Sequence, residues 1–241
     1  MRFSLIIPSY NNAHELQQEL PALLRYCLES GWKVETIIVD DGSTASSNLT
    51  DWCSQEGWRL IRHEKNLGKG AAVRSGMLAA SEDIRIFTDA DIPFQYNVFQ
   101  DIMRAFEDGK TEIVVGDRRK SDYFAKSSVM RRLGSAVFSL AVDIIMTKRL
   151  GDTQCGLKAF RSKAVDEIFT NQQLHGFAAD IEWLYRARIG KRKVVSVSAE
   201  FRNAGNSSVV FWKHAVLMLR DVIVYGFLNV CETKMGCHQT T

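Results

Sequence analysis

The sequence predicts an α/β fold in which helices flank a mostly parallel β-sheet. Along the first half of the chain, short apolar runs alternate with amphipathic segments at the spacing of β-α-β units. The runs at 37–39 and 113–115 are continuously apolar, as in strands covered on both faces of a sheet. The 241 residues are 46% hydrophobic and 24% charged, an ordinary composition for a globular protein with a sizeable core.

The expected elements follow one another in a regular order. The first strand, 3–8, is an apolar run that ends at a proline, and the helix at 14–28 repeats leucine along one face. The second strand, 34–39, leads into a turn with helix-capping residues at 40–44. The same alternation predicts a helix at 45–55, a strand at 58–61, a helix at 71–80, a strand at 84–88, a helix at 98–106 and a strand at 112–115.

Charge, cysteine content and hydropathy exclude several classes of protein. The net charge of +3 is too small to indicate a nucleic-acid partner. Five cysteines without C-x-x-C spacing favour a reducing compartment, and the five histidines lack zinc-ligand spacing. No signal-peptide pattern is present, and the apolar stretch 133–147, which contains a single charge, is too short to span a bilayer. We therefore expect a cytoplasmic protein.

The most informative segment is 84–93, where a β-branched strand ends in Asp89-Ala90-Asp91. Side chains two residues apart in an extended segment leave on the same face, so both carboxylates are expected to point beyond the strand end. Two hard oxygen donors suit Mg²⁺ or Mn²⁺, which share their remaining positions with water and substrate phosphates. Aspartate pairs are also common in turns and helix caps.

Other polar clusters also follow predicted strands. Because ligands of parallel α/β sheets bind beyond the carboxyl ends of the strands, these clusters are expected to meet at one edge. They are Pro8-Ser9-Tyr10-Asn11-Asn12 after the first strand, Asp40-Asp41-Gly42-Ser43 after the second, Asp89-Ala90-Asp91 after the fourth and Gly116-Asp117-Arg118-Arg119 after the fifth.

A glycine-rich segment, 66–76, opens the helix at 71–80 and contains Lys69. It lacks the spacing of a Walker A loop. Glycines at a helix start favour close approach of an anion to free backbone N–H groups. Alternatively, Gly70 and Gly76 allow only capping and tight packing against the sheet, and the sequence does not choose between the two.

Taken together, these motifs resemble a known family. Pro8-x-Tyr10-Asn11, Val39-Asp40-Asp41-Gly42-Ser43, Asn66-x-Gly68-Lys69-Gly70 and Asp89-Ala90-Asp91 resemble the inverting family-2 glycosyltransferases of the GT-A fold. Segments 151–160 and 177–182 are similar to the branch that loads dolichyl and other polyprenyl phosphates with glucose or mannose. The resemblance spans residues 3–228. It implies one domain, 1–230, with a nucleotide-sugar-binding half at 1–117, an acceptor-binding half with C-terminal helices at 118–230, and a tail at 231–241.

The resemblance implies roles for individual residues. The nucleotide-sugar donor would contact Pro8, Tyr10, Asn12, the backbone of Val39, Asp41, Lys69, Asp89, Ala90 and Asp91. Asp89 and Asp91 would hold Mg²⁺ or Mn²⁺, with Asp91 as the direct ligand. Arg118 would hold a donor or acceptor phosphate, Arg131 or Arg132 the acceptor phosphate, and Arg202 the diphosphate.

The implied reaction is transfer of a hexose from UDP-glucose or GDP-mannose to a polyprenyl phosphate with inversion. The metal and arginines would stabilise charge on the departing diphosphate. An anionic prenyl phosphate needs no strong base, whereas a hydroxyl acceptor would need one, for which Asp180 and Asp152 are the candidates. The alternatives are a glycan or other hydroxyl acceptor, or a non-catalytic nucleotide-sugar-binding protein.

Two positions depart from the pattern of this branch. Asn12 stands where an acid is usual, and Ser208 stands where a lysine is usual. The segments 133–147 and 209–230 carry basic and aromatic residues beside apolar ones, so they are expected either to contact the cytoplasmic face of a membrane peripherally or to pack in the core.

Overall fold

The computed structural model describes residues 1–44, 47–118, 152 and 155–202. Its seven strands are β1 Arg2–Ser9, β2 Lys33–Asp40, β3 Arg59–Arg62, β4 Ile84–Thr88, β5 Ile113–Asp117, β6 Leu157–Arg161 and β7 Val194–Ser198. The described helices are α1 Ala13–Glu29, α2 Ser47–Glu56, α3 Lys69–Ala79, α4 Asn97–Phe106, α7 Ser162–Thr170 and α8 Ala179–Ile189. The strands and helices predicted up to residue 117 are all present, with ends shifted by at most two residues.

The strands form one sheet in the order β3-β2-β1-β4-β6-β5-β7. All neighbours pair in parallel except β6, which runs antiparallel to both β4 and β5. The sheet is therefore mostly parallel, as predicted, but β6 and β7 were not among the expected strands. Because β4 and β5 point the same way, the carboxyl ends of β2, β1, β4 and β5 lie at one edge, together with the start of β6.

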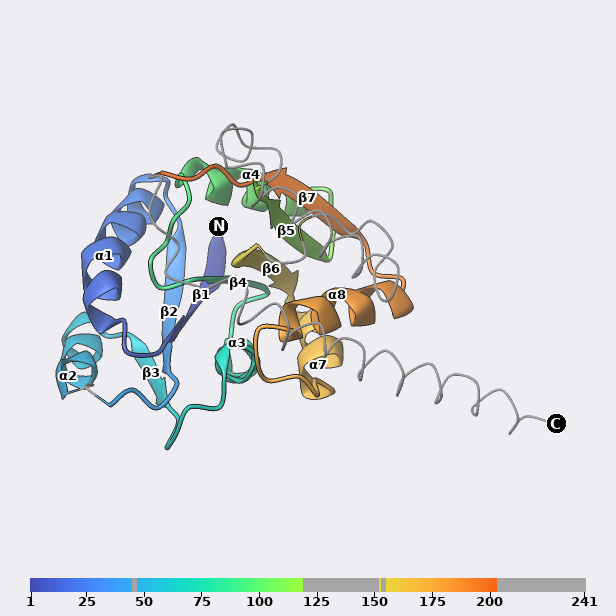
Figure 1. Cartoon of the computed structure of the whole chain (residues 1–241). Coiled ribbons are helices and arrows are strands. Elements are labelled where there is room, and N and C mark those ends of the chain that lie inside the picture. Colours follow the sequence, from blue (N-terminus) through green and yellow to red (C-terminus); the bar gives the residue numbers. More distant parts are fainter. Residues whose placement is uncertain (45–46, 119–151, 153–154, 203–241) are drawn as a thin grey trace, which may run out of the picture.

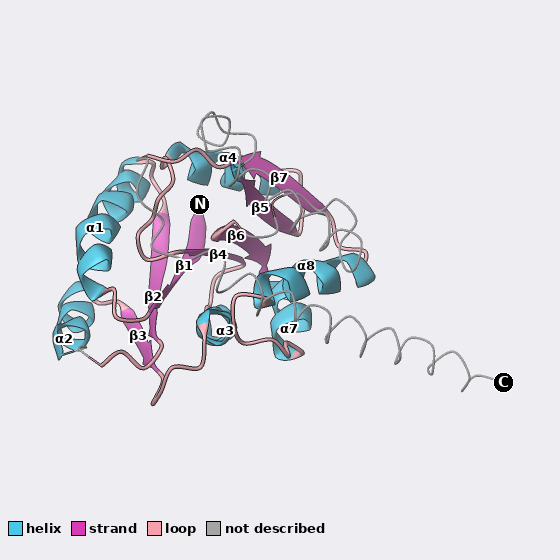
Figure 2. Cartoon of the chain, viewed as in Figure 1, coloured by secondary structure: helices cyan, strands magenta, loops and turns pink. Residues whose placement is uncertain are grey.

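Helices cover both faces of this sheet (Figure 1, Figure 2). Alternate residues of β1 show the division, because Phe3, Leu5 and Ile7 pack in one buried cluster and Ile6 packs in the other. The first cluster contains the apolar faces of α1, α2 and α4, and the second contains those of α3, α7 and α8. This three-layer arrangement explains why strand residues of both parities are apolar.

Several predictions lie outside the described residues. They include the segments 133–147 and 209–230, Arg131, Arg132, Ser208 and the tail. Among the helices that the structure does describe, none is both long and apolar enough to cross a membrane.

Candidate active site

The ends of β1 and β2 form one side of the site. Pro8 and Val39 lie opposite each other in the register of these strands and are both buried. The backbone N–H of Asp41 donates to the carbonyl of Ser9 at 2.8 Å, which fixes the two strand ends together. Tyr10, the next residue, is 46% exposed. Its aromatic ring is thus available to a ligand at the edge where the sequence predicts a nucleotide.

The loop after β1 is held by amide side chains. The Asn12 Oδ1 atom accepts from the Ser9 hydroxyl at 2.8 Å and from the Tyr10 N–H at 2.9 Å. Asn11, at φ 55°, donates its N–H to the Ser43 hydroxyl at 2.8 Å across to the loop after β2. An amide oxygen at position 12 therefore accepts the same two hydrogen bonds that a carboxylate oxygen would, so the departure from the usual acid leaves the loop braced.

Asp41 is buried and linked to the glycine-rich segment. Its Oδ1 accepts the N–H of Leu67 at 2.9 Å and lies 2.7 Å from His63 Nδ1, and its Oδ2 accepts the N–H of Gly68 at 2.8 Å. Only 2% of the residue is exposed. The carboxylate thus connects the end of β2 to the residues that lead into α3. His63 was given no role from the sequence, because an isolated histidine carries no pattern.

The glycines of this segment are explained by packing. A Cβ atom on Gly70 would lie 2.4 Å from the Ala179 Cβ, and one on Gly76 would lie 2.4 Å from Ile6 Cγ2. The N–H of Ala71, in the first turn of α3, donates to the His175 carbonyl at 3.0 Å. The start of α3 therefore docks on the loop before α8, which favours the packing interpretation of these glycines.

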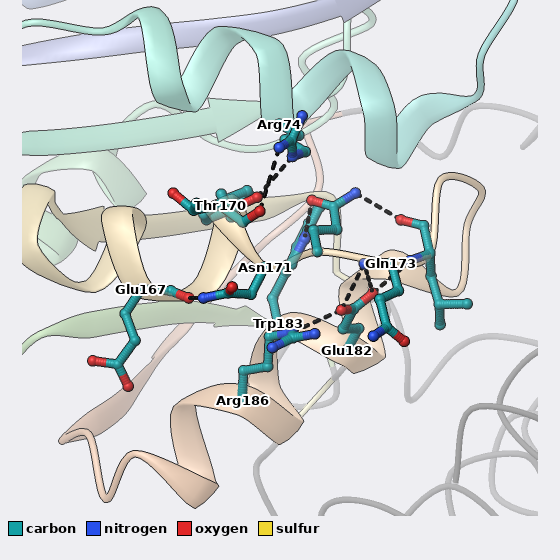
Figure 3. Close-up of polar contacts among 11 residues, drawn as sticks. Arg74, Glu167, Thr170, Asn171, Gln173, Glu182, Trp183 and Arg186 are labelled. Atoms are coloured by element: carbon teal, nitrogen blue, oxygen red, sulfur yellow. Dashed lines mark hydrogen bonds and ion pairs between the residues drawn. The ribbon is translucent and has the colours of Figure 1, made fainter. Parts of the chain in front are cut away.

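Glu182 holds that loop in place (Figure 3). Its carboxylate is fully buried and accepts the N–H groups of Gln173 and Leu174 at 2.8 and 2.6 Å, and it pairs with Arg186 at 2.7 Å. On the facing helix, Arg74 donates to the Phe169 carbonyl at 2.7 Å. The acidic end of the 177–182 motif is thus a structural brace for the loop that packs on α3.

Asp89 and Lys69 form an ion pair at the end of β4. The Lys69 ammonium lies 2.5 Å from Asp89 Oδ1. Burial alone would lower the pKa of Lys69, but the negative charges of Asp89 and Asp180 raise the pKa above its ordinary value. Lys69 therefore stays charged beside the aspartate that the sequence predicts as a metal and donor residue.

The Asp89 carboxylate packs so closely on Gly156 that no larger residue fits at that position. Its N–H donates to the Gly156 carbonyl at 3.2 Å, and a Cβ built on Gly156 would lie only 1.8 Å from Asp89 Oδ2. The carboxylate therefore packs directly against the backbone that leads into β6. This contact explains the glycine of the 151–160 motif in physical terms.

Asp91 differs from Asp89 because its side chain is exposed. Partial desolvation by neighbouring atoms raises the pKa of Asp91 above its ordinary value, and the nearby negative charge of Asp89 adds to the rise. Two carboxylates one residue apart supply the oxygen donors that Mg²⁺ and Mn²⁺ prefer, so the chemistry of the pair fits a divalent ion. Within the described part of the chain, no three His, Cys, Asp or Glu side chains are grouped to bind a metal, so other ligands would come from water or substrate.

Arg118, just beyond β5, makes a two-pronged ion pair with Asp152. Its Nε and Nη2 atoms lie 2.5 and 2.9 Å from the two carboxylate oxygens, and its side chain is 32% exposed. Burial opposes ionisation of Asp152, but Arg118 outweighs it and holds the pKa of Asp152 below its ordinary value. Asp152 is thus a stable anion and a weak proton acceptor.

Asp180 is likewise paired. It lies in the first turn of α8, where its Oδ1 accepts from the fully buried ammonium of Lys158 on β6. Lys158 also donates to the Cys155 carbonyl at 2.6 Å and lies 5.5 Å from the centre of the Phe87 ring. Cys155 is fully buried, and burial raises the pKa of its thiol to about 12, as in an unreactive structural cysteine.

Arg202 approaches the site from the end of the described chain. Its guanidinium pairs with Glu19 on α1, donates to the Tyr96 hydroxyl at 2.6 Å and lies 4.5 Å from the centre of that ring. A further bond at 3.2 Å reaches the Ile92 carbonyl, next to Asp91. The structure thus brings Arg202 to the loop that carries Asp89 and Asp91.

A model of the family described as Glycosyl transferase family 2 matches residues 4–169. The chain belongs to this family. It is therefore a glycosyltransferase that uses a nucleotide sugar as donor. The matched region contains the clusters after β1, β2 and β4 and the Arg118–Asp152 pair.

Individual relatives agree with the family. The dolichyl-phosphate β-glucosyltransferase of Dictyostelium discoideum is 29% identical over 240 residues, which cover 93% of this chain and 73% of that protein. The mannosyl-3-phosphoglycerate synthase structure from Rubrobacter xylanophilus superposes with a TM-score of 0.69 at 15% identity, over 100% of this chain and 76% of the other. Glucosyl-3-phosphoglycerate synthase from Mycobacterium tuberculosis, in complex with Mn²⁺, UDP-glucose and phosphoglyceric acid, gives 0.65 at 18% identity, over 96% and 80%. The fold is the predicted GT-A fold.

Proposed function

We propose that this glycosyltransferase moves a hexose from UDP-glucose or GDP-mannose to a polyprenyl phosphate, with inversion at the anomeric carbon. The choice of acceptor is supported by the ion pairs that both candidate bases form. Asp152 is held by Arg118, and Asp180 is held by the buried ammonium of Lys158. A hydroxyl acceptor needs a base to remove its proton, whereas a phosphate attacks as an anion without one.

The donor would lie across the ends of β2, β1 and β4. The base and ribose would contact Tyr10, the Val39 backbone and Asp41, and the diphosphate would lie near Lys69 and the Asp89–Asp91 pair. One domain would hold both substrates, with the donor on residues 1–117 and the acceptor on 118–230. The known sites of α/β sheets at topological switch points support this placement, because β1 and β4 flank such a point here.

Asp89 and Asp91 would hold Mg²⁺ or Mn²⁺, and the ion, when bound, would supply Lewis-acid stabilisation of the diphosphate. Cationic side chains of the protein would add to this stabilisation of the diphosphate. Lys69 pairs with Asp89, and Arg202 lies beside the loop that carries both aspartates. Fixed positive groups of this kind stabilise the charge that develops on a departing diphosphate.

Arg118 would orient the acceptor phosphate from the β5 end of the site. Its guanidinium is held by Asp152, and its side chain is 32% exposed. A positioned arginine suits phosphate because its planar N–H groups match two oxygens at once. Arg131 and Arg132 would add to this acceptor site, and peripheral contact with a membrane surface would bring the lipid within reach.

The test is a sugar-transfer assay with radiolabelled donors. UDP-glucose and GDP-mannose are each offered with polyprenyl phosphate and Mg²⁺ or Mn²⁺, and label is counted in the organic phase with and without EDTA. We expect organic-phase label from one donor and its loss with EDTA. Donor binding without any lipid product, while a glycan acceptor becomes labelled, would overturn the proposed acceptor.

A further inference from the structure

His63 lies between Asp41 and helix α3. Its Nδ1 atom lies 2.7 Å from Asp41 Oδ1, and its Nε2 atom lies 2.9 Å from the Ser75 hydroxyl. The imidazole is only 10% exposed, and the backbone N–H of His63 donates to the Asp40 carbonyl at 2.9 Å. His63, the residue directly after β3, thus connects the end of β2 to the middle of α3.

Asp41 determines which nitrogen of His63 carries a proton. An ionised carboxylate can only accept hydrogen bonds, so the Nδ1 atom that faces Asp41 must carry a proton. A serine hydroxyl can either donate or accept, so Ser75 pairs with Nε2 whatever the proton on that atom. Ser75 therefore holds the opposite edge of the ring and keeps Nδ1 directed at Asp41.

This arrangement leaves Asp41 with limited capacity for a ligand. Its two oxygens offer about four acceptor positions. Three are used by His63, the Leu67 N–H and the Gly68 N–H, so one remains, on Oδ2. Because the other three bonds prevent rotation of the carboxylate, the remaining acceptor position is fixed in space.

A Ser-His-Asp arrangement also suggests nucleophilic catalysis, but the surroundings of Ser75 disfavour it. Ser75 lies inside α3, whose backbone N–H groups are used by the helix and cannot stabilise an oxyanion. The next residue, Gly76, packs tightly on Ile6 and Val39.

We propose that His63 is a positioning residue for the nucleoside of the donor. It holds Asp41 so that the remaining Oδ2 acceptor position meets an N–H or O–H group of the base or ribose, and Ser75 holds the imidazole in the orientation that faces Asp41. The same unit fixes Leu67 and Gly68, directly before Lys69. This inference rests on the proposed donor site and adds to it a residue that never touches the substrate.

Two conservative substitutions separate the two bonds of His63. In His63→Asn, the side-chain amide replaces Nδ1 and keeps the bond to Asp41. In His63→Gln, the longer side chain replaces Nε2 and keeps the bond to Ser75. Affinity for UDP and GDP is measured by calorimetry on the purified full chain without acceptor, and thermal unfolding is followed in parallel. His14→Asn, on the exposed start of α1, is the control.

We expect the asparagine variant to bind its nucleotide within about threefold of the wild type. The glutamine variant is expected to bind at least about tenfold more weakly, the scale of one hydrogen bond to a charged group. Both should unfold at similar temperatures. Equal affinities of the two variants, or losses that follow only the unfolding temperature, would overturn the positioning role. A wild type that binds neither nucleotide would instead overturn the proposed donor site.

The Ser75→Ala variant tests the second contact of His63 separately. It keeps the contact between His63 and Asp41 but removes the hydroxyl that holds Nε2, so the imidazole is less firmly oriented and nucleotide affinity should fall by about threefold. An unchanged affinity, measured beside Ser54→Ala on the exposed side of α2, would contradict the role of Ser75.

Discussion

Replacing Lys158 with methionine leaves Asp180 as an unpaired charge inside the protein. The lysine side chain is 0% exposed and that of the aspartate is 6% exposed, so water cannot take the place of the lost partner. Breaking such a buried pair costs about 3–5 kcal/mol. For a chain of this length, where 1 kcal/mol shifts the unfolding midpoint by about 2–4 °C, the expected loss is about 6–20 °C.

The double variant Lys158→Met/Asp180→Asn removes both charges and is expected to recover most of this loss. The four unfolding midpoints of the cycle are measured by calorimetry under one buffer condition. The exposed pair of Asp101 and Arg104 provides the control, because Asp101→Asn should cost less than about 1 kcal/mol.

The same double variant tests the mechanism. If Asp180 is structural, sugar transfer by the stable double variant should remain within about tenfold of the wild type. A catalytic base contributes about 10²- to 10⁴-fold to the rate. A well-folded double variant with a rate lowered more than about 100-fold would therefore refute the argument that both candidate bases are paired structural groups.

Three further outcomes are expected. Asp91→Ala should lower the metal-dependent transfer rate at least about 100-fold while the unfolding midpoint is kept, and an unchanged rate would contradict the metal site. Gly156→Ala should weaken donor binding, because its methyl group would displace the carboxylate 1.8 Å away, whereas Gly176→Ala, with open space around it, should not. Arg118→Gln should remove a pH-dependent part of the stability. Because the pKa of Asp152 is depressed in the folded protein, the stability that the ion pair contributes is complete above the ordinary carboxyl pKa of about 4 and is lost as pH falls through the native value. The free energy of unfolding in urea should therefore change less between neutral and acidic pH in the variant than in the wild type.

Local sequence patterns predicted the fold and the edge of the sheet at which the polar clusters gather. Apolar runs and their spacing located β1 to β5, and the D-x-D motif at the end of β4 followed from strand geometry alone. The structure then placed Tyr10, Asp41 and Lys69 around the same edge. These features are local, so the sequence carries them directly.

Features that depend on distant partners were not predictable in this way. Strand β6 contains Lys158 amid apolar residues, and its burial makes sense only beside Asp180, 22 residues further along the chain. His63 has no sequence pattern, because its partners lie 22 and 12 residues away on different elements. Gly70 and Gly76 were open to two interpretations until the packing around them was known.

The most direct measurement compares two acceptors that differ in one group. Polyprenyl phosphate and the polyprenol of equal length are offered with the same labelled donor and Mg²⁺, and organic-phase product is counted for each. The account predicts product with the phosphate and none with the alcohol, because the phosphate is already an anion and both candidate bases are paired. Comparable transfer to the alcohol would contradict the central claim that the acceptor is a phosphate.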